Sequence, residues 1–198
     1  MKAEDSKRAA RQAGGRPPSP EAGAAVGAAE LSFLRRAVGL ALEAERRGDL
    51  PVGAVVVLGG EVVAEASNAV LVPEYHPGRH AETEALGRVP AALWPRAREM
   101  TCYTTLEPCV MCAGALLLHG VGRVVFGAAD EEGGAGALLG NLPPYYAGGS
   151  GVPEWVGPAL SEECAPLYRR MVGRFDALPC GRGSFPRPGG PPRASGGD

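Results

Sequence analysis

The sequence predicts an α/β sandwich built around a mixed sheet, and three observations lead to that prediction. A β-hairpin pattern lies near residue 60, helical and strand patterns alternate after it, and 45% of the residues are hydrophobic. A chain of 198 residues with this composition fits a single domain with an ample core. We expect that domain at residues 29–178, between tails at 1–28 and 179–198 whose Ala, Gly, Pro and Arg content predicts disorder.

The first half of the domain should form a helix, a hairpin and a second helix. Apolar residues recur at helical spacing from Leu31 until the Gly-Asp pair at 48–49 interrupts the pattern. Two valine-rich runs, at 53–58 and 61–65, flank a Gly-Gly pair, which is typical of a tight turn that needs positive φ. Residues 80 to about 88 return to a helical pattern.

The second half should alternate strands with helices. The run at 101–105 is rich in β-branched residues and predicts a strand, whereas 109–119 predicts an apolar helix that Gly120 closes. The run at 121–127 predicts another strand. The last helix, at about 161–177, should begin with a serine and two glutamates, which suit a helix N-terminus.

The stretch from 133 to 158 fits neither period, because Gly and Pro interrupt it throughout. A long irregular segment in a compact domain is either a functional loop or a disordered one. This one carries three leucines, two tyrosines and a tryptophan, which favour burial. We therefore expect a packed loop close to the functional site.

The charge pattern gives no sign of a large polyanion-binding face. The formal net charge is −2, but residues 1–20 carry +3 and residues 179–198 carry +2, which leaves −7 on the middle of the chain. Nucleic-acid binders usually show a basic face. An acidic body with basic ends therefore points away from that class, although charge could still cluster locally.

Cysteine use and the absence of targeting signals predict a cytoplasmic protein. The five cysteines are an odd number without a framework spacing, which is typical of a reducing compartment. No apolar run follows the charges of the first residues, as a secretory signal would require. No stretch approaches the roughly 20 apolar residues of a membrane helix, so we expect no membrane partner.

Four residues form a pattern that is typical of a catalytic metal centre. His80, Cys109 and Cys112 supply three ligands, and the carboxylate of Glu82 is left over. A structural zinc site takes four protein ligands, whereas a catalytic one keeps a position open for water. Both cysteines lie at the start of a predicted helix, whose dipole favours thiolates, and the histidine would start a second helix facing the same point. We expect one zinc ion per subunit.

Glu82 is the expected catalytic proton carrier. Zinc can lower the pKa of its water to about 7, and the carboxylate could pass a proton from that water to a ring nitrogen and then to a departing amine. Such chemistry is hydrolytic deamination, and the H-x-E and P-C-x-x-C pairing is the arrangement of the zinc deaminases of nucleobases. We therefore expect a zinc-dependent hydrolase that acts on the C–N bond of a cyclic amidine. A closed structural site with an unseen fourth ligand would leave Glu82 without a purpose.

Longer blocks resemble the cytidine deaminase superfamily, the CMP/dCMP-type zinc deaminases. They are PVGAV at 51–55, HAE at 80–82, TLEPCVMCAGA at 105–115 and RVVFGA at 123–128, with Asn68 between the first two. Within that superfamily the chain is most similar to the bacterial tRNA-specific adenosine deaminases. The resemblance implies a three-layer α/β/α sandwich with a five-stranded mixed sheet, and assembly as a homodimer.

The resemblance also implies which residues contact the substrate. These are Asn68 at the base or sugar, Val52 and Gly53 along the pocket, the amide of Ala81 and the carbonyl of Glu107 facing the base, and Asp130 at the substrate backbone.

The departures from the tRNA enzymes concern the RNA-contacting periphery and not the zinc centre. Ala129 stands where an arginine is expected, and His76 where an aspartate is expected. Residues 139–157 replace a shorter Asn-His-Arg region, and the strongly basic C-terminal helix is reduced to three arginines between 169 and 174. For these arginines, both RNA contact and an ordinary solvated helix face stay open.

Three hypotheses on function follow. The first is conversion of adenosine to inosine at the wobble position of tRNA, a step of tRNA processing. The second is deamination of a free base or nucleoside such as guanine, cytosine or cytidine, a step of nucleoside metabolism, which the acidic body and the replaced peripheral segments favour. The third is a catalytically silent relative that binds RNA or protein, against which the intact Glu82 and the full ligand set argue.

Overall fold

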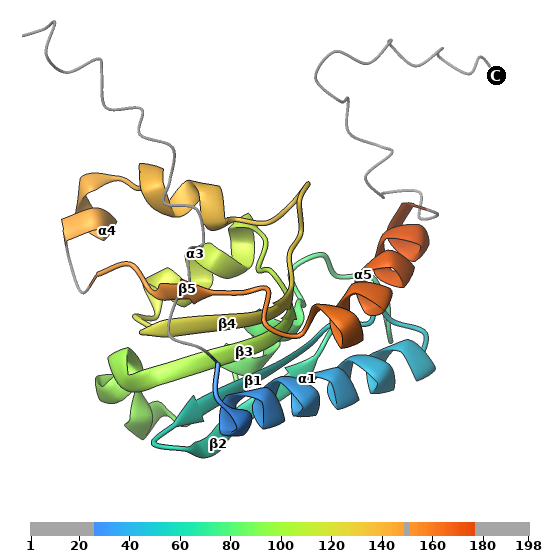
Figure 1. Ribbon diagram of the computed structural model, residues 1–198, viewed down its shortest axis with the longest axis horizontal. Helices are drawn as coiled ribbons and strands as arrows, with labels where there is room; N and C mark the ends of the chain where they lie inside the picture. The colour runs from blue at the N-terminus through green and yellow to red at the C-terminus, as the bar shows by residue number, and fades with distance from the viewer. Residues whose placement is uncertain (1–25, 149–150, 177–198) are drawn as a thin grey trace, which may run out of the picture.

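The computed structural model describes residues 26–148 and 151–176. The tails expected to be disordered, at 1–28 and 179–198, lie outside the described residues except for 26–28, and helix α1 already begins at Ala28. One five-stranded sheet runs through the described residues, with helices packed on both of its faces (Figure 1). The predicted three-layer α/β/α sandwich with a mixed sheet is therefore confirmed.

The helices and strands follow one another in the predicted alternation, with some additions. In chain order they are α1 (Ala28–Arg46), β1 (Gly53–Leu58), β2 (Glu61–Ser67), α2 (Ala81–Leu86), the 3-10 helix η3 (Ala91–Glu99), β3 (Met100–Leu106), α3 (Val110–Leu118), β4 (Arg123–Ala128), the 3-10 helix η4 (Gly136–Asn141), α4 (Pro144–Gly148), β5 (Glu154–Val156) and α5 (Ser161–Asp176). None of the helices in this described part of the chain is long and apolar enough to cross a membrane.

The sheet is mixed because one half of it is antiparallel and the other half is parallel. Its strand order is β2-β1-β3-β4-β5, with β1 antiparallel to both β2 and β3, and β4 parallel to both β3 and β5. The β1–β2 turn is the predicted hairpin, and Gly59 and Gly60 adopt φ values of 61° and 85°, which side chains disfavour. The parallel half places the ends of β3 and β4 at one edge of the sheet, where the residues that follow each strand can meet.

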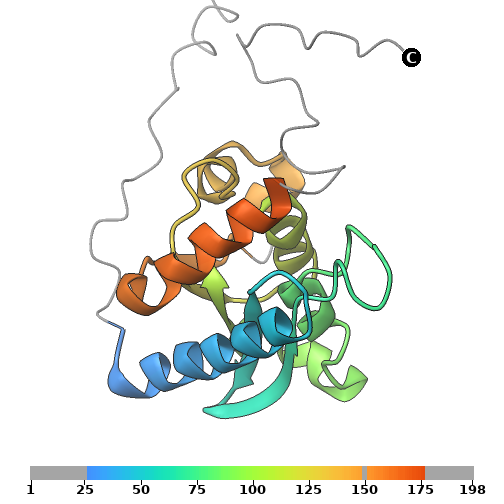
Figure 2. The ribbon, with the colours of Figure 1, turned by 90° about the vertical axis from the view of Figure 1, so that its right-hand side faces the viewer.

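Helices α1 and α5 lie side by side over one face of the sheet, and α2 and α3 lie over the other face (Figures 1 and 2). Each strand contributes side chains to the packing of both helical layers, because successive side chains point to opposite faces of the sheet. On β1, Val55 and Val57 pack under Leu34 of α1, whereas Val56 packs toward Leu116 of α3. Burial on both faces explains why β1 is continuously apolar and not alternating.

The expectation of a loop throughout 133–158 is wrong in part. The segment forms η4, α4 and the short edge strand β5, although it is packed as expected: Trp155 of β5 packs against Phe126 of β4 in a tilted arrangement, with ring centroids 5.9 Å apart. The 3-10 helix η3 was not predicted either. It contains Pro95 and has only one buried residue, so no apolar period marks it in the sequence.

At Gly53 the backbone of β1 lies directly against α1. A Cβ at this position would collide with the carbonyl oxygen of Ala37 and lie 2.9 Å from the amide nitrogen of Ala41. We expect Gly53→Ala to lower the free energy of unfolding by about 3 kcal/mol, because backbone atoms would have to move apart. Denaturant titration measures this effect.

Gly39 provides the matched control, since it lies inside α1 with open space around it. Gly39→Ala should raise the free energy of unfolding by about 0.5–1 kcal/mol, because alanine is the better helix former. Equal effects of the two substitutions would contradict the close approach at Gly53.

Candidate active site

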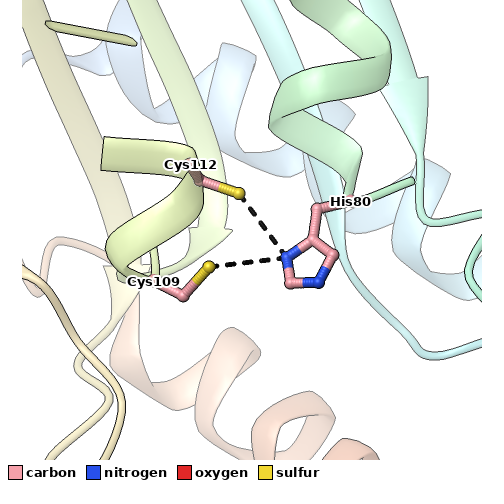
Figure 3. A group of neighbouring side chains, drawn as sticks. All are labelled: His80, Cys109 and Cys112. Atoms are coloured by element: carbon pink, nitrogen blue, oxygen red, sulfur yellow. Dashed lines mark hydrogen bonds between the residues drawn. The ribbon is translucent and has the colours of Figure 1, made fainter. Parts of the chain in front are cut away.

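Two helix N-termini bring the three predicted metal ligands together. His80 is the N-cap residue of α2, and Cys109 is the N-cap residue of α3, with Cys112 in the first turn of the same helix. The Nδ1 atom of His80 lies 3.6 Å from Cys109 Sγ and 3.5 Å from Cys112 Sγ (Figure 3). The ligand atoms of all three residues lie within 4.8 Å of one another. The predicted meeting of the two helix starts is therefore what the structure shows.

These distances fit a tetrahedral metal ion. Ligand bonds of about 2.0–2.3 Å to nitrogen and sulfur place neighbouring ligand atoms roughly 3.6 Å apart around a tetrahedral ion. The observed N···S separations of 3.5 and 3.6 Å match that spacing. Two thiols and one imidazole are also a donor set that suits zinc and other borderline-soft metals.

The two thiols are coupled in a way that a cation would relieve. Interaction with the Cys112 side chain, together with the hydrogen bond to His80, holds the pKa of Cys109 well below its usual range, at about 4. Interaction with Cys109 and burial raise the pKa of the Cys112 thiol, whose proton points to Glu82 Oε2. A metal ion between the two sulfurs would displace that proton and let both sulfurs be thiolates.

Glu82 lies beside the three predicted ligands and contacts one of them. It is the second residue of α2 and only 3% exposed. Its Oε1 accepts a hydrogen bond from the Thr104 hydroxyl at 3.0 Å, and its Oε2 accepts one from the Cys112 thiol at 3.3 Å. Burial raises the pKa of this carboxyl. A carboxyl whose protonated form is favoured in this way is suited to accept and return a proton.

A cavity of about 410 Å³ opens in front of these residues. Its lining includes His80, Glu82 and Cys109, so two of the three predicted metal ligands and the predicted proton carrier border one space. Four of the substrate contacts that the resemblance implies also line it: Val52, Asn68, Glu107 and Asp130. Gly53 and Ala81 are neighbours of lining residues along the chain. In the described part of the chain they do not themselves line the cavity.

The side chains of Glu107 and Asp130 hold the segment after β4 against the site. Glu107 accepts hydrogen bonds from the Gly136 amide at 3.1 Å, from the Trp155 indole at 3.3 Å and from the Asp130 amide at 3.3 Å. One oxygen of Asp130 accepts the Tyr168 hydroxyl at 2.7 Å and two amides of its own turn. The expectation that this segment packs near the site is therefore confirmed.

Two of the three arginines on α5 are engaged within the protein. Arg170 forms a bidentate ion pair with Glu45 of α1, and Arg174 donates to the carbonyl oxygen of Gly48, which follows α1. These contacts fasten α5 to α1 and give both arginines a structural role.

Sequence reasoning missed several residues that border the site. Thr104 lies inside a β-branched strand, where nothing in the sequence distinguishes it from its neighbour Thr105. Met171 and Phe175 reach the cavity from α5, about sixty residues after the cysteines, and Tyr75 and Leu50 reach it from loops. Only the packing of distant segments brings these side chains to the cavity.

Comparison with known proteins agrees with this site. The model of the MafB19-like deaminase family matches residues 29–143. The chain is 43% identical to the tRNA-specific adenosine deaminase of Bacillus subtilis over 112 residues, which cover 56% of this chain and 68% of that protein. It is 32% identical to a probable cytosine deaminase of Schizosaccharomyces pombe over 148 residues, which cover 68% of this chain and 86% of that protein.

A solved structure from studies of A-to-I editing by deaminases of the tRNA wobble position has the same fold. It superposes with a TM-score of 0.58 at 29% sequence identity, over 69% of this chain and 99% of the other. The predicted place of the chain among the cytidine deaminase-like proteins is thus confirmed. Because the family model spans more than half of the chain and includes all three ligands and Glu82, the chain belongs to the MafB19-like deaminase family.

Proposed function

We propose that this protein is a zinc-dependent hydrolase that converts adenosine to inosine at the wobble position of tRNA. The observation that carries the proposal is Glu82, a buried carboxyl beside a cluster of three metal ligands that leaves a fourth position open. The identity to tRNA-specific adenosine deaminases, 43% in the case of Bacillus subtilis, supports the choice of substrate.

In the proposed site, His80 Nδ1 and the sulfurs of Cys109 and Cys112 hold one zinc ion per subunit. The separations of these atoms and their coupled protonation support that assignment. A bound zinc ion would polarise a water molecule and lower its pKa toward about 7. The hydrogen bond between the Thr104 hydroxyl and Glu82 Oε1 keeps the carboxyl turned toward the sulfur of Cys112 and hence toward that water.

Glu82 then moves the protons of the reaction. Its carboxylate takes a proton from the attacking water and delivers it to the ring nitrogen next to the amino-bearing carbon. The second proton of the water leaves with the amine, so one water is consumed, a carbonyl forms at the ring carbon and ammonia is released. Burial assists the uptake of the proton from water, because it favours the neutral carboxyl.

The remaining substrate contacts belong to the same proposal. Asn68 and Val52 would touch the base or its sugar from the cavity wall, and the backbone of Ala81 and Glu107 would face the base edge. Asp130 would contact the substrate backbone with the oxygen that Tyr168 does not engage. Gly53 would act by keeping β1 close to α1 and so setting the position of Val52.

A second candidate is deamination of a free base or nucleoside, and one feature of the cavity favours it. The lining residues that the structure describes include four carboxylates, Glu82, Glu107, Asp130 and Glu132, and no arginine or lysine. A phosphate backbone would gain no cationic partner from these walls. The identity to a probable cytosine deaminase points in the same direction. A catalytically silent relative is disfavoured, since such a protein has no need of a buried carboxyl that costs free energy to desolvate.

An ammonia-release panel with zinc-loaded protein tests the proposal. It should contain guanine, cytosine, cytidine, adenosine and a tRNA anticodon stem-loop with adenosine at the wobble position. We expect ammonia and inosine only with the stem-loop, and none from a matched stem-loop with guanosine at that position. Activity confined to a free base or nucleoside would replace the tRNA assignment with the second candidate, and no activity on any substrate would contradict deamination.

We propose further that the enzyme is a homodimer that pairs through α3. Val110, Met111 and Leu118 are 61%, 39% and 68% exposed on this helix. Together with Gly114 they fall on one side of α3, opposite the buried Leu116, because a helix turns by 100° per residue. An exposed apolar stripe of this kind is typical of a protein–protein interface.

Sedimentation at micromolar concentration should give twice the 20.3 kDa mass of one chain. Leu118→Glu should shift the protein to a monomer, because two carboxylates would face each other across a two-fold interface. Leu42→Glu, at a leucine of α1 that is 40% exposed, is the control and should leave the mass unchanged. A monomeric wild-type protein would contradict the dimer.

The proposed location is the cytoplasm, where tRNA is processed. The four cysteines in the described residues are all free thiols, in keeping with a reducing compartment. Recovery of the protein in a secreted or membrane fraction would contradict this location.

A further inference from the structure

Asp49 is a fully buried carboxylate in the Gly-Asp pair that ends the first helix. It follows Gly48 in the turn after α1, and its side chain has no exposure to solvent. Its backbone amide donates to the carbonyl oxygen of Ala44 at 2.9 Å, which closes the helix. A carboxylate in such a position is tolerated only when nearby donors satisfy it.

Four donors, one from the next residue and three from the 68–72 loop, satisfy Asp49. Its Oδ1 accepts hydrogen bonds from the Leu50 amide at 2.7 Å and from Asn68 Nδ2 at 3.3 Å. Its Oδ2 accepts the amides of Leu71 and Val72, at 3.1 and 3.0 Å. Three of the four donors are backbone amides, and the fourth is a side chain that lines the cavity.

The contact with Asp49 decides which way the Asn68 amide faces. A carboxylate accepts hydrogen bonds but donates none, so Asn68 has to direct its NH2 group at Asp49 and its carbonyl oxygen elsewhere. The backbone of Asn68 is also fixed, because its amide donates to the carbonyl oxygen of Val52 at 2.9 Å. Within residues 26–148 and 151–176, no group donates a hydrogen bond to Asn68 Oδ1.

We propose that Asp49 is a positioning residue that makes Asn68 present a hydrogen-bond acceptor to the substrate. The substrate group that Asn68 recognises is then a donor, either a hydroxyl of the sugar or an N–H of the base. Asn68 shares the cavity wall with His80 and Glu82, so an acceptor fixed there orients the base relative to the reacting centre. This inference rests on the proposed deaminase function for its kinetic test but not for its structural one.

The kinetic test replaces Asp49 by its isostere. In Asp49→Asn, the carbonyl oxygen of the new amide keeps the hydrogen bonds from the Leu71 and Val72 amides, and its NH2 faces Asn68 at the cost of the hydrogen bond from the Leu50 amide. Asn68 then rotates and offers its own NH2 to the cavity. We expect KM to rise about tenfold, which corresponds to the loss of one hydrogen bond, with a smaller change in kcat and with zinc content unchanged. Glu45→Gln, at a carboxylate of α1 that pairs with Arg170, is the control and should leave KM unchanged.

A double-mutant cycle separates positioning from a general structural role. In an Asn68→Ala background the residue to be positioned is absent, so Asp49→Asn should change KM by less than about twofold. An unchanged tenfold rise in that background would show that Asp49 acts only by holding the 68–72 loop, and would overturn the proposal.

A nuclear magnetic resonance measurement on the wild-type protein tests the geometry without any activity. The side-chain amide signal of Asn68 is the one that disappears in Asn68→Ala. We expect one of its two protons to exchange slowly with solvent, because it is held by buried Asp49. Rapid exchange of both protons would overturn the proposal even if Asp49→Asn fails to fold. Absence of activity on every substrate would instead refute the proposed function and leave this result standing.

Discussion

Glu82→Gln should reduce kcat by about 10³- to 10⁴-fold while the protein keeps its fold and its metal. Glutamine has the shape of glutamate and can still accept the hydrogen bond from the Thr104 hydroxyl through its carbonyl oxygen. It cannot take up a proton and return it. The substitution therefore removes proton transfer alone, provided that the amide settles in the orientation that Thr104 dictates.

The stability of Glu82→Gln should not fall below that of the wild type. Glu82 is buried, and burial raises the pKa of its carboxyl, so ionising it in the folded state costs free energy that a neutral amide does not. Thermal unfolding and zinc analysis would verify that the loss of rate is not a loss of structure. Both measurements are to be made on the same preparation as the kinetics.

Glu84 supplies a control on the same helix. It lies two residues beyond Glu82, forms a bidentate ion pair with Arg79 at 3.0 and 3.2 Å, and is not among the described residues that line the cavity. Glu84→Gln should keep kcat within about twofold, and the lost pair should cost less than about 1 kcal/mol. Full activity of zinc-loaded Glu82→Gln would rule out the assigned proton transfer.

The metal ligands and Glu82 could be predicted from the sequence because each pair lies on a single local element. Cys109 and Cys112 are one helical turn apart, and Glu82 follows His80 within one turn. Spacing along one helix fixes the relative direction of two side chains before any tertiary structure is known. Only one part of the prediction joined distant segments, namely that the two helix N-termini meet. Its reason was that three ligands have to reach the same metal ion.

Asp49 and Thr104 could not be assigned from spacing, because their roles depend on contacts across the fold. Thr104 meets Glu82 because β3 pairs with β1 and α2 packs over both strands. Asp49 meets Asn68 because β2 returns to the end of α1. A buried aspartate in a Gly-Asp turn looks in the sequence like any other helix stop.

The same distinction between local and distant contacts explains the errors in the fold. The β1–β2 hairpin was predicted because the Gly59-Gly60 turn is a local signal with a steric cause. Strand β5 was missed because it has three residues and exists only through its pairing with β4, across a segment rich in Gly and Pro. A strand of three residues is too short to show an alternating pattern of hydrophobic residues. Its pairing with another strand adds no local signal to the sequence.

Removal of the metal should abolish activity and lower stability together. Incubation with a chelator is expected to reduce the rate at least 10³-fold. Among the described residues near Glu82, no side chain can replace the metal in lowering the pKa of a water molecule. If the ion is present at about 1,000 times its dissociation constant, its removal lowers the free energy of unfolding by about 4 kcal/mol. Thermal unfolding and rate should both recover when one equivalent of zinc is restored, and recovery without added metal would contradict a metal-dependent reaction.

Cysteine substitutions connect this loss to the proposed ligands. Cys112→Ser should lower zinc content and rate together, because an alcohol is a far weaker ligand than a thiolate. Cys102→Ala is the matched control: Cys102 is equally buried, and burial raises the pKa of its thiol, so it behaves as a small apolar side chain in the sheet. That variant should lose about 1 kcal/mol of stability and still bind one zinc ion per subunit. Equal zinc loss in the two variants would mean that removing any buried thiol disrupts the site, and that Cys112 does not bind the ion directly.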